Sequence, residues 1–224
     1  IFRNLISGFS GKVFPVNPKA SEIDGQPCYP DLRRIREQVD LCVIATPAAV
    51  VLDVMESCAV KGVKNVIIIS GGFSEIGQGE LEKKVTQIGK EEGMRIIGPN
   101  CLGIYDAHSR INAFFLPNYR IQTPKPGNVA FLSQSGAVAG GGLDWAASEN
   151  IGISKIVSYG NRIDVGEIEM LEYLENDPKT KVILIYLEGL TEGKKFIDVA
   201  RRVSRKKTIV AFKVGNSEKG ATAV

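Results

Sequence analysis

Apolar residues along this chain alternate between short continuous runs and spaced stripes, a pattern that predicts strands separated by helices. Residues 41–46 (LCVIAT) and 65–70 (NVIIIS) are almost wholly apolar, which is typical of strands buried on both faces of a sheet. Between them, four apolar side chains follow the i, i+3, i+4, i+7 spacing of one helix face: Val51, Val54, Met55 and Cys58. We therefore expect a strand–helix–strand unit in this region.

The same alternation covers most of the remaining chain. Further strands are expected at 12–17, 94–97, 128–133, 154–159, 181–187 and 208–213. Further helices are expected around 81–88, 139–146, 167–176 and 196–203. This order is typical of parallel sheets with right-handed crossovers, in which ligands bind beyond the carboxyl ends of the strands. The sequence thus predicts an α/β fold and directs attention to the residues that follow each strand.

A segment rich in proline and polar residues, 117–127 (PNYRIQTPKPG), interrupts the alternation, and we interpret it as a linker. It predicts two domains, residues 1–120 and 121–224. The first residues (IFRN) have the pattern of the middle of a helix. We therefore expect the natural protein to contain residues before this opening.

Composition narrows the function classes. The 224 residues carry a formal net charge of +3 with acids and bases interspersed, which argues against nucleic-acid binding. No apolar run approaches the roughly 20 residues of a membrane span, so we expect no membrane association. The four cysteines are scattered without a CxxC pair, which argues against a zinc or other metal site. Reduced thiols and a cytoplasmic location are expected.

Turn residues follow each of the first three expected strands, and they predict a ligand cleft. Parallel strands place these turns on one rim, where glycines allow close approach of a phosphate or pantetheine chain and helix amino ends supply N–H donors. Singly, each turn is equally consistent with ordinary strand-to-helix connections. The residues concerned are Asn17 and Lys19, Thr46 and Pro47, and Ser70, Gly71 and Gly72. Together they favour a nucleotide-like ligand, although no GxGxxG motif occurs near residue 1.

A sharper motif lies in the second half of the chain. Residues 133–136 (SQSG) connect a strand to a helix, and their hydroxyls and free N–H groups suit a phosphoryl dianion. The alternative is that Ser133 or Ser135 only caps the helix. Glu188 follows the apolar run 181–187 and could fix the tautomer of an imidazole, the alternative being an exposed loop acid. The only histidine, His108, is assigned no role in catalysis.

These motifs occur in an order that resembles a known family. The series GPNCLG (98–103), SQSG (133–136), YGN (159–161) and LEG (187–189) is similar to that of the ADP-forming acyl-CoA synthetases and of the succinyl-CoA synthetase α subunit. The resemblance covers essentially all 224 residues, and as a set the motifs are specific. Residues 93–100 (GMRIIGPN) look particularly similar to the archaeal type of acetyl-CoA synthetase.

The resemblance implies a Rossmann-like CoA-binding domain followed by a flavodoxin-like domain. It implies reversible conversion of acyl-CoA, ADP and phosphate into acid, CoA and ATP through an acyl phosphate and a phosphohistidine. ADP or ATP with Mg²⁺ would bind a partner ATP-grasp subunit or domain in an oligomer, and the other substrate would be a small acid.

The resemblance also assigns residues. Glu188 would orient the phosphohistidine. The phosphoryl group would be held by Ser133, Gln134, Ser135 and Gly136, with Gly160 and Asn161 shaping the pocket. The CoA cleft would be lined by Asn17, Lys19, Thr46, Pro47, Ser70, Gly71, Gly72 and Asn100.

Two family features have no counterpart in these residues. The Gly-rich CoA loop is expected before residue 1, and the phosphorylated histidine is expected in a Ser-His-Thr-Gly segment after residues 220–224 (GATAV). His108 does not match that segment. Two other functions remain open. One is a non-catalytic CoA-binding module, such as the synthetase-like part of a protein acyltransferase. The other is a nicotinamide-dependent dehydrogenase, which leaves the SQSG turn without a role.

Overall fold

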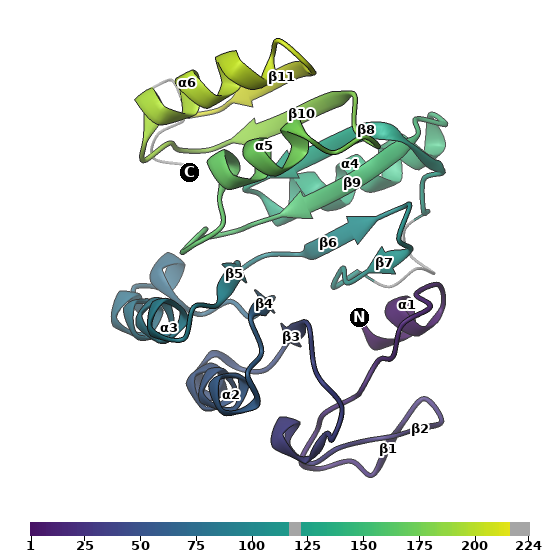
Figure 1. Ribbon diagram of the computed structural model, residues 1–224, viewed down its shortest axis with the longest axis vertical. Helices are drawn as coiled ribbons and strands as arrows, with labels where there is room; N and C mark the ends of the chain where they lie inside the picture. The colour runs from purple at the N-terminus through teal and green to yellow at the C-terminus, as the bar shows by residue number, and fades with distance from the viewer. Residues whose placement is uncertain (117–121, 216–224) are drawn as a thin grey trace.

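The computed structural model describes residues 1–116 and 122–215, which form two larger sheets flanked by helices. A three-stranded parallel sheet runs in the order β3 (Cys42–Ile44), β4 (Asn65–Ile68) and β5 (Arg95–Ile97). A six-stranded sheet follows in the order β11-β10-β8-β9-β6-β7. Figure 1 shows the small sheet with α2 and α3 at one end of the molecule and the large sheet at the other.

The first sheet is covered by helices on one face. α2 (Ala48–Lys61) and α3 (Gly79–Glu91) bury Val51, Met55, Cys58 and Val85 against it. The expected apolar stripe on the first of these helices is thus the packing face. On the other side of the sheet, α1 (Phe2–Ile6) contributes to a separate cluster that contains Ile67 of β4. Burial on both faces explains why these strands are almost wholly apolar.

The expected strand at 12–17 is wrong. The structure has only an isolated bridge between Val16 and Tyr29 there. Pro15 has no N–H to donate to a ladder, which disfavours a regular strand. The chain instead forms a small hairpin from β1 (Glu22–Ile23) and β2 (Gln26–Pro27), followed by a short 3-10 helix, η1 (Leu32–Arg34).

The large sheet has a parallel centre. Its strands β8 (Pro126–Ser133), β9 (Ile153–Ser158), β10 (Val182–Leu187) and β11 (Thr208–Lys213) are all parallel to their neighbours in this group. The helices α5 (Glu167–Glu175) and α6 (Gly193–Val203) pack in one core cluster with β8 and β10, whereas α4 (Gly136–Ser148) packs in another with β9. The helices therefore cover both faces, as in a flavodoxin-like fold.

Two short strands that the sequence did not predict extend this sheet. β6 (Gly103–Asp106) pairs antiparallel with β9, and β7 (Ile111–Asn112) pairs antiparallel with β6. Figure 1 shows β6 and β7 between the parallel part of the large sheet and the small sheet. The chain thus passes from one sheet to the other between residues 97 and 103, ahead of the expected linker. Residues 117–121 lie outside the described residues, and the domain limits 1–120 and 121–224 stay a prediction.

A buried ion cluster joins β6 to the parallel part of the sheet. The Lys155 ammonium on β9 lies 3.2 Å from Asp106 and 2.9 Å from Asp177, which follows α5. Thr180 also donates a hydrogen bond of 2.7 Å to Asp177. Lys155 and Asp177 are each only 9 % exposed, so the two charges satisfy one another in a poorly solvated place.

Candidate functional site

The carboxyl ends of strands from both sheets meet at one junction. The Asn100 N–H donates to Ser70 O (2.9 Å) and the Asn161 N–H donates to Pro99 O (2.9 Å), so the segments after β4, β5 and β9 adjoin. Gly160 has a left-handed φ of 51°, and a Cβ there would lie 2.2 Å from Pro99 O. Glycine is therefore required at this crossing. The geometry brings together predicted residues from both halves of the chain.

Thr46 and Ser70 lie side by side at the ends of β3 and β4. The Ser70 hydroxyl donates to Thr46 O at 2.5 Å. The Thr46 hydroxyl is buried and has no hydrogen-bond partner among the residues that the structure describes. A buried polar atom without a partner costs free energy unless a ligand or water meets it. This donor set is thus compatible with a polar ligand such as CoA.

The glycine turn after β4 is already occupied by a carboxylate of the chain. Glu75, in the short helix η2 (Ser74–Ile76), accepts hydrogen bonds from Gly72 N–H (2.5 Å) and Phe73 N–H (3.1 Å). Partial burial alone would raise the pKa of Glu75, but hydrogen bonds from Asn161 and from these N–H groups hold it below its usual value. Gly71 is exposed beside this turn. The Gly72 N–H is therefore not free for a phosphate in this structure.

The other residues expected to line the CoA cleft are surface residues. Asn17 accepts a hydrogen bond from Lys19 N–H (2.9 Å), which forms a local turn, and both are exposed. Pro47 is the exposed residue that precedes α2. Asn100 is exposed and donates from its amide to Asn161 Oδ1 at 3.3 Å. Of these four, Asn100 is the one whose side chain reaches the junction.

The SQSG turn is held by its own hydroxyls. Ser135 is the N-cap of α4 and its hydroxyl accepts a hydrogen bond from Val138 N–H. Ser133 is fully buried and its hydroxyl donates to Ser135 O at 2.7 Å. The capping alternative considered for Ser135 is thus what the structure contains, and Gly136 begins the helix. Contact of either hydroxyl with a phosphoryl group stays a prediction.

The side chain of Gln134 is hydrogen-bonded to the turn that carries Glu188. Its carbonyl oxygen accepts hydrogen bonds from the Glu188 N–H and from the Gly189 N–H (2.9 Å). Its amide nitrogen donates to Gly189 O at 2.9 Å. The Gln134 side chain, which was expected to contact the phosphoryl group, is therefore hydrogen-bonded to the backbone of the neighbouring loop in this structure.

Glu188 presents a free carboxylate from a fixed backbone. Its carbonyl oxygen accepts a hydrogen bond from Lys213 at 2.9 Å. The side chain is half-buried, and within residues 1–116 and 122–215 its carboxylate has neither a hydrogen bond nor an ion pair. A half-buried carboxylate on a braced turn is suited to accept a proton or hydrogen bond from a group brought to it.

No role was predicted for three further residues near this turn, although Tyr159 belongs to the YGN motif. Arg162 donates to Gly189 O (2.6 Å) and pairs with the buried Glu167 at 3.0 Å. The Tyr159 hydroxyl is buried and has no partner in the described part of the chain. Burial raises the pKa of Tyr159, and the nearby carboxylates of Glu167 and Glu188 raise it further. The sequence does place Arg162 five residues before Glu167, the first residue of α5, but spacing alone does not show that the two side chains pair.

Comparison with known proteins places this geometry in a family. Residues 1–107 match a family described as a CoA binding domain, and residues 126–224 match the succinyl-CoA ligase like flavodoxin domain. An acetate–CoA ligase (ADP-forming) of Methanocaldococcus jannaschii is 46 % identical over 223 residues, which is 100 % of this chain and 31 % of that protein. The α subunit of acetate–CoA ligase (ADP-forming) II of Pyrococcus furiosus is 42 % identical, over 100 % of this chain and 48 % of that subunit. The chain belongs to the ADP-forming acyl-CoA synthetase family.

Solved structures of the family agree with the fold. The apo form of the dinucleotide forming acetyl-coenzyme A synthetase 1 of Ca. Korarchaeum cryptofilum superposes with a TM-score of 0.93 and 45 % identity, over 99 % of this chain and 48 % of that one. The CoA-binding and flavodoxin-like domains expected from the resemblance are thereby confirmed. The chain spans between about a third and a half of the length of these synthetases.

His108 is remote from this junction. It lies after β6, whose Asp106 end pairs with the start of β9, whereas Gly160 and Asn161 follow the end of β9. Its ring contacts Gly127 O at 2.9 Å. In the described residues there is also no group of three or more His, Cys, Asp or Glu placed to hold a metal, and no helix suited to crossing a membrane.

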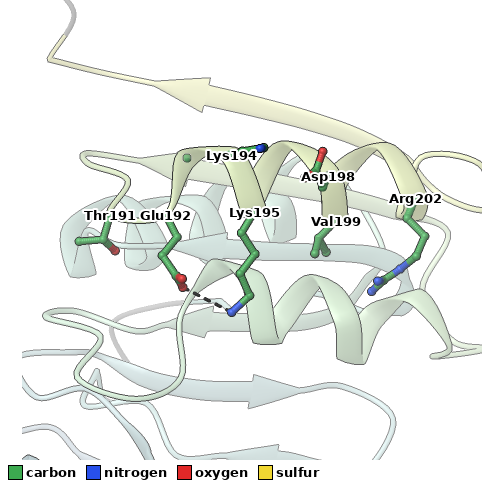
Figure 2. Close-up of a pocket in the computed structure, with 8 residues that line it drawn as sticks. Thr191, Glu192, Lys194, Lys195, Asp198, Val199 and Arg202 are labelled. Carbon is green, nitrogen blue, oxygen red and sulfur yellow. Dashed lines mark hydrogen bonds and ion pairs between the residues drawn. The ribbon is translucent and has the colours of Figure 1, made fainter.

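Two surface hollows lie outside this junction. One, of about 570 Å³, runs along α6 and includes Glu192, Lys195 and Arg202. Figure 2 shows these three side chains on one side of the helix, with Lys195 3.4 Å from Glu192. The other, of about 530 Å³, lies beside η1 at Asp31 and Arg33. Neither hollow includes a residue predicted to bind CoA or a phosphoryl group.

Proposed function

We propose that the complete protein is an ADP-forming acyl-CoA synthetase, of which this chain supplies the CoA side and the phosphoryl-transfer pocket. The observation that carries the proposal is the free Glu188 carboxylate, held on a braced turn beside the amino end of α4. The family relatives, which are named as ligases, support it.

The proposed reaction has three balanced steps. A phosphate oxygen bonds to the acyl carbon of acyl-CoA and the CoA thiolate leaves, which gives an acyl phosphate. A histidine nitrogen then bonds to phosphorus and the carboxylate of the free acid leaves. Finally a terminal oxygen of ADP bonds to that phosphorus, the histidine leaves and ATP forms. This histidine is expected after residues 220–224, which lie outside the described residues.

The chain's own residues would act on the second and third steps. The amino end of α4 attracts a phosphoryl dianion, because its first N–H groups lack intrahelical acceptors and the helix dipole is positive there. The Val138 N–H already donates to the Ser135 hydroxyl, so the N–H groups of Gly136 and Ala137 would present the donors. Glu188 would accept the N–H of the histidine ring and so fix its tautomer. Gly160 and Asn161 would form the adjoining wall.

CoA would bind along the ends of β3 and β4. The partnerless Thr46 hydroxyl would be a polar contact, with Ser70, Gly71 and Gly72 shaping the adjacent surface. Lys19 would supply a cation for a CoA phosphate, and Asn17, Pro47 and Asn100 complete the proposed lining. CoA brings the thiol that the reaction exchanges.

The remaining components would lie outside this chain. ADP or ATP with Mg²⁺ would bind an ATP-grasp domain or subunit, the acid would be small, and the assembly would be an oligomer. We also propose a cytoplasmic location, which fits the free thiols of the four cysteines.

The test is histidine phosphorylation of the complete protein by ATP and Mg²⁺, measured as an alkali-stable, acid-labile phosphoryl group. Glu188→Gln is expected to slow labelling by about 100-fold, because it removes a charge that acts on the reacting group. Glu149→Gln, an exposed acid that follows α4, is the control and is expected to label normally.

Two results would separate the proposal from its alternative. A wild-type protein that binds CoA but is never phosphorylated would support the non-catalytic CoA-binding module instead. Normal labelling of Glu188→Gln would remove that carboxylate from the mechanism and leave the synthetase activity standing.

A further inference from the structure

We propose that Gln134 is a positioning residue for phosphoryl transfer, which fixes Glu188 relative to the amino end of α4, rather than a ligand of the phosphoryl group. The inference rests on the proposed function, because it concerns how Glu188 is placed for that reaction.

The side chain of Gln134 makes three hydrogen bonds to the Glu188 turn. Its carbonyl oxygen has two lone pairs, and it accepts from the N–H groups of Glu188 and Gly189. Its amide nitrogen donates to Gly189 O at 2.9 Å. Only the second N–H of its amide is left for a phosphoryl group, and turning the side chain to aim that N–H would break bonds to the turn in a residue that is 7 % exposed. Releasing buried partners is costly, so the contacts to the turn prevail.

The three bonds tie the start of α4 to the turn that carries Glu188. Gln134 directly precedes the N-cap of α4, and its own N–H donates to Tyr186 O of β10 at 3.3 Å. The residue that begins the phosphoryl-binding turn therefore also holds the backbone from which Glu188 projects. Two elements that must act on one reacting group are joined through a single side chain.

Other contacts brace the same turn from different sides. Arg162 donates to Gly189 O at 2.6 Å, and Lys213 donates to Glu188 O at 2.9 Å. Neither of these cations bonds the N–H groups of the turn. Gln134 alone among the described residues accepts from both of those N–H groups, so its loss frees the edge of the turn that faces α4.

The expected signature is a slower chemical step with unaltered CoA binding. Gln134→Leu has a similar size but no hydrogen-bonding atoms, and in the complete protein it is expected to lower the rate of histidine phosphorylation by about 100-fold, as a misplaced catalytic group does. The dissociation constant for CoA is expected to stay within about twofold, since the CoA residues belong to the other sheet. Ser154→Ala is the control, because Ser154 is a fully buried hydrogen-bonded residue at the opposite end of β9.

A double-mutant cycle distinguishes positioning from general destabilisation. If Gln134 acts through Glu188, then adding Gln134→Leu to the Glu188→Gln variant should lower its rate of histidine phosphorylation by less than about threefold. If the two residues act independently, the two reductions in rate would multiply. Multiplying effects, or equal slowing by Ser154→Ala, would overturn the proposal.

A second variant covers the case in which Gln134→Leu does not fold. Gln134→Glu keeps an acceptor for the two N–H groups, replaces the donor to Gly189 O with a second oxygen and adds a negative charge, and about tenfold slower phosphorylation is expected. An unchanged rate in this variant overturns the inference. Absence of phosphorylation in the wild-type protein would instead refute the proposed function itself.

Discussion

The amide nitrogen of Asn161 donates to Glu75 Oε2 at 2.8 Å, which joins the loop after β9 to the turn after β4. The same nitrogen lies 2.7 Å from Glu82 Oε2. One amide from the large sheet thus holds two acids of the small-sheet region together. The contact explains why a residue expected to shape the phosphoryl pocket also belongs to the boundary between the two sheets.

Asn161→Asp tests this contact. It is expected to lower the free energy of unfolding at pH 7 by about 1 kcal/mol or more, because a donor is replaced by a third carboxylate beside two others. The loss is expected to shrink as the pH falls toward 4, when the carboxylates become protonated. Urea unfolding at several pH values measures both effects. Asn161→Ala is the control, and a pH dependence in that variant equal to that of Asn161→Asp would contradict the explanation.

The Lys155 cluster predicts acid sensitivity. Burial alone would raise the pKa of Asp177, but the hydrogen bonds from Lys155 and Thr180 place it below the usual value. A carboxyl group whose pKa is lower in the folded state stabilises the fold above its unfolded value of about 4, and that stability is lost as the pH falls through the folded pKa.

Asp177→Asn should therefore lower the free energy of unfolding at pH 7 by about 3 kcal/mol, because it leaves a poorly solvated ammonium with one acid fewer. The difference in the free energy of unfolding between this variant and the wild-type protein should become smaller below about pH 4. Chemical denaturation across pH 3 to 7 provides the measurement. Glu80→Gln, in an exposed pair with Lys83, is expected to change little at any pH, and a constant deficit for Asp177→Asn at every pH would refute the assignment.

Gly160 and Gly141 form a matched pair of glycine-to-alanine tests. Gly160→Ala is expected to cost about 2 kcal/mol or more, since its φ is 51° and its Cβ would overlap Pro99 O. Gly141→Ala, within α4 with open space around its Cβ, is expected to stabilise by about 0.5–1 kcal/mol. Thermal unfolding compares the two, and equal effects would show that the crossing at Gly160 tolerates a side chain.

Two buried tyrosines differ in whether their hydroxyl has a partner. Tyr159→Phe is expected to leave stability unchanged or raise it by about 1 kcal/mol, because a partnerless buried hydroxyl only costs desolvation. Tyr105→Phe is expected to lose about 1 kcal/mol, because that hydroxyl donates to Pro124 O at 3.1 Å. Denaturant unfolding of both variants is the measurement. A clear loss in Tyr159→Phe would mean that an ordered water satisfies its hydroxyl.

Long apolar periodic segments were predictable from the sequence. The strand expected at 208–213 has the bounds Thr208–Lys213, and the helix expected from Val51, Met55 and Cys58 buries those residues. Such elements are specified by one buried face, which periodicity records. β6 and β7 were missed because four and two residues give no readable period, and because the antiparallel partner of β6 in the large sheet, β9, is distant in sequence.

The sequence predicted where the candidate site lies better than it predicted how the side chains of that site are arranged. The rule that ligands bind beyond strand ends drew attention to Ser70, Gly160 and Glu188, and the structure brings the first two together at the junction. Which way a side chain turns depends on its neighbours in space, which the sequence does not give. The bonds from Gln134 to the Glu188 turn were therefore not predicted, and Arg162 was overlooked.

The pairing of β6 with β9 has a consequence for dividing this protein into pieces. A chain starting at residue 121 would lack β6 and β7, so β9 would become an outer strand with unpaired backbone groups along one side. Such an edge invites pairing with other molecules and aggregation. A chain starting near residue 98 would keep β9 paired with β6, so we expect it to aggregate less than a chain that starts at residue 121.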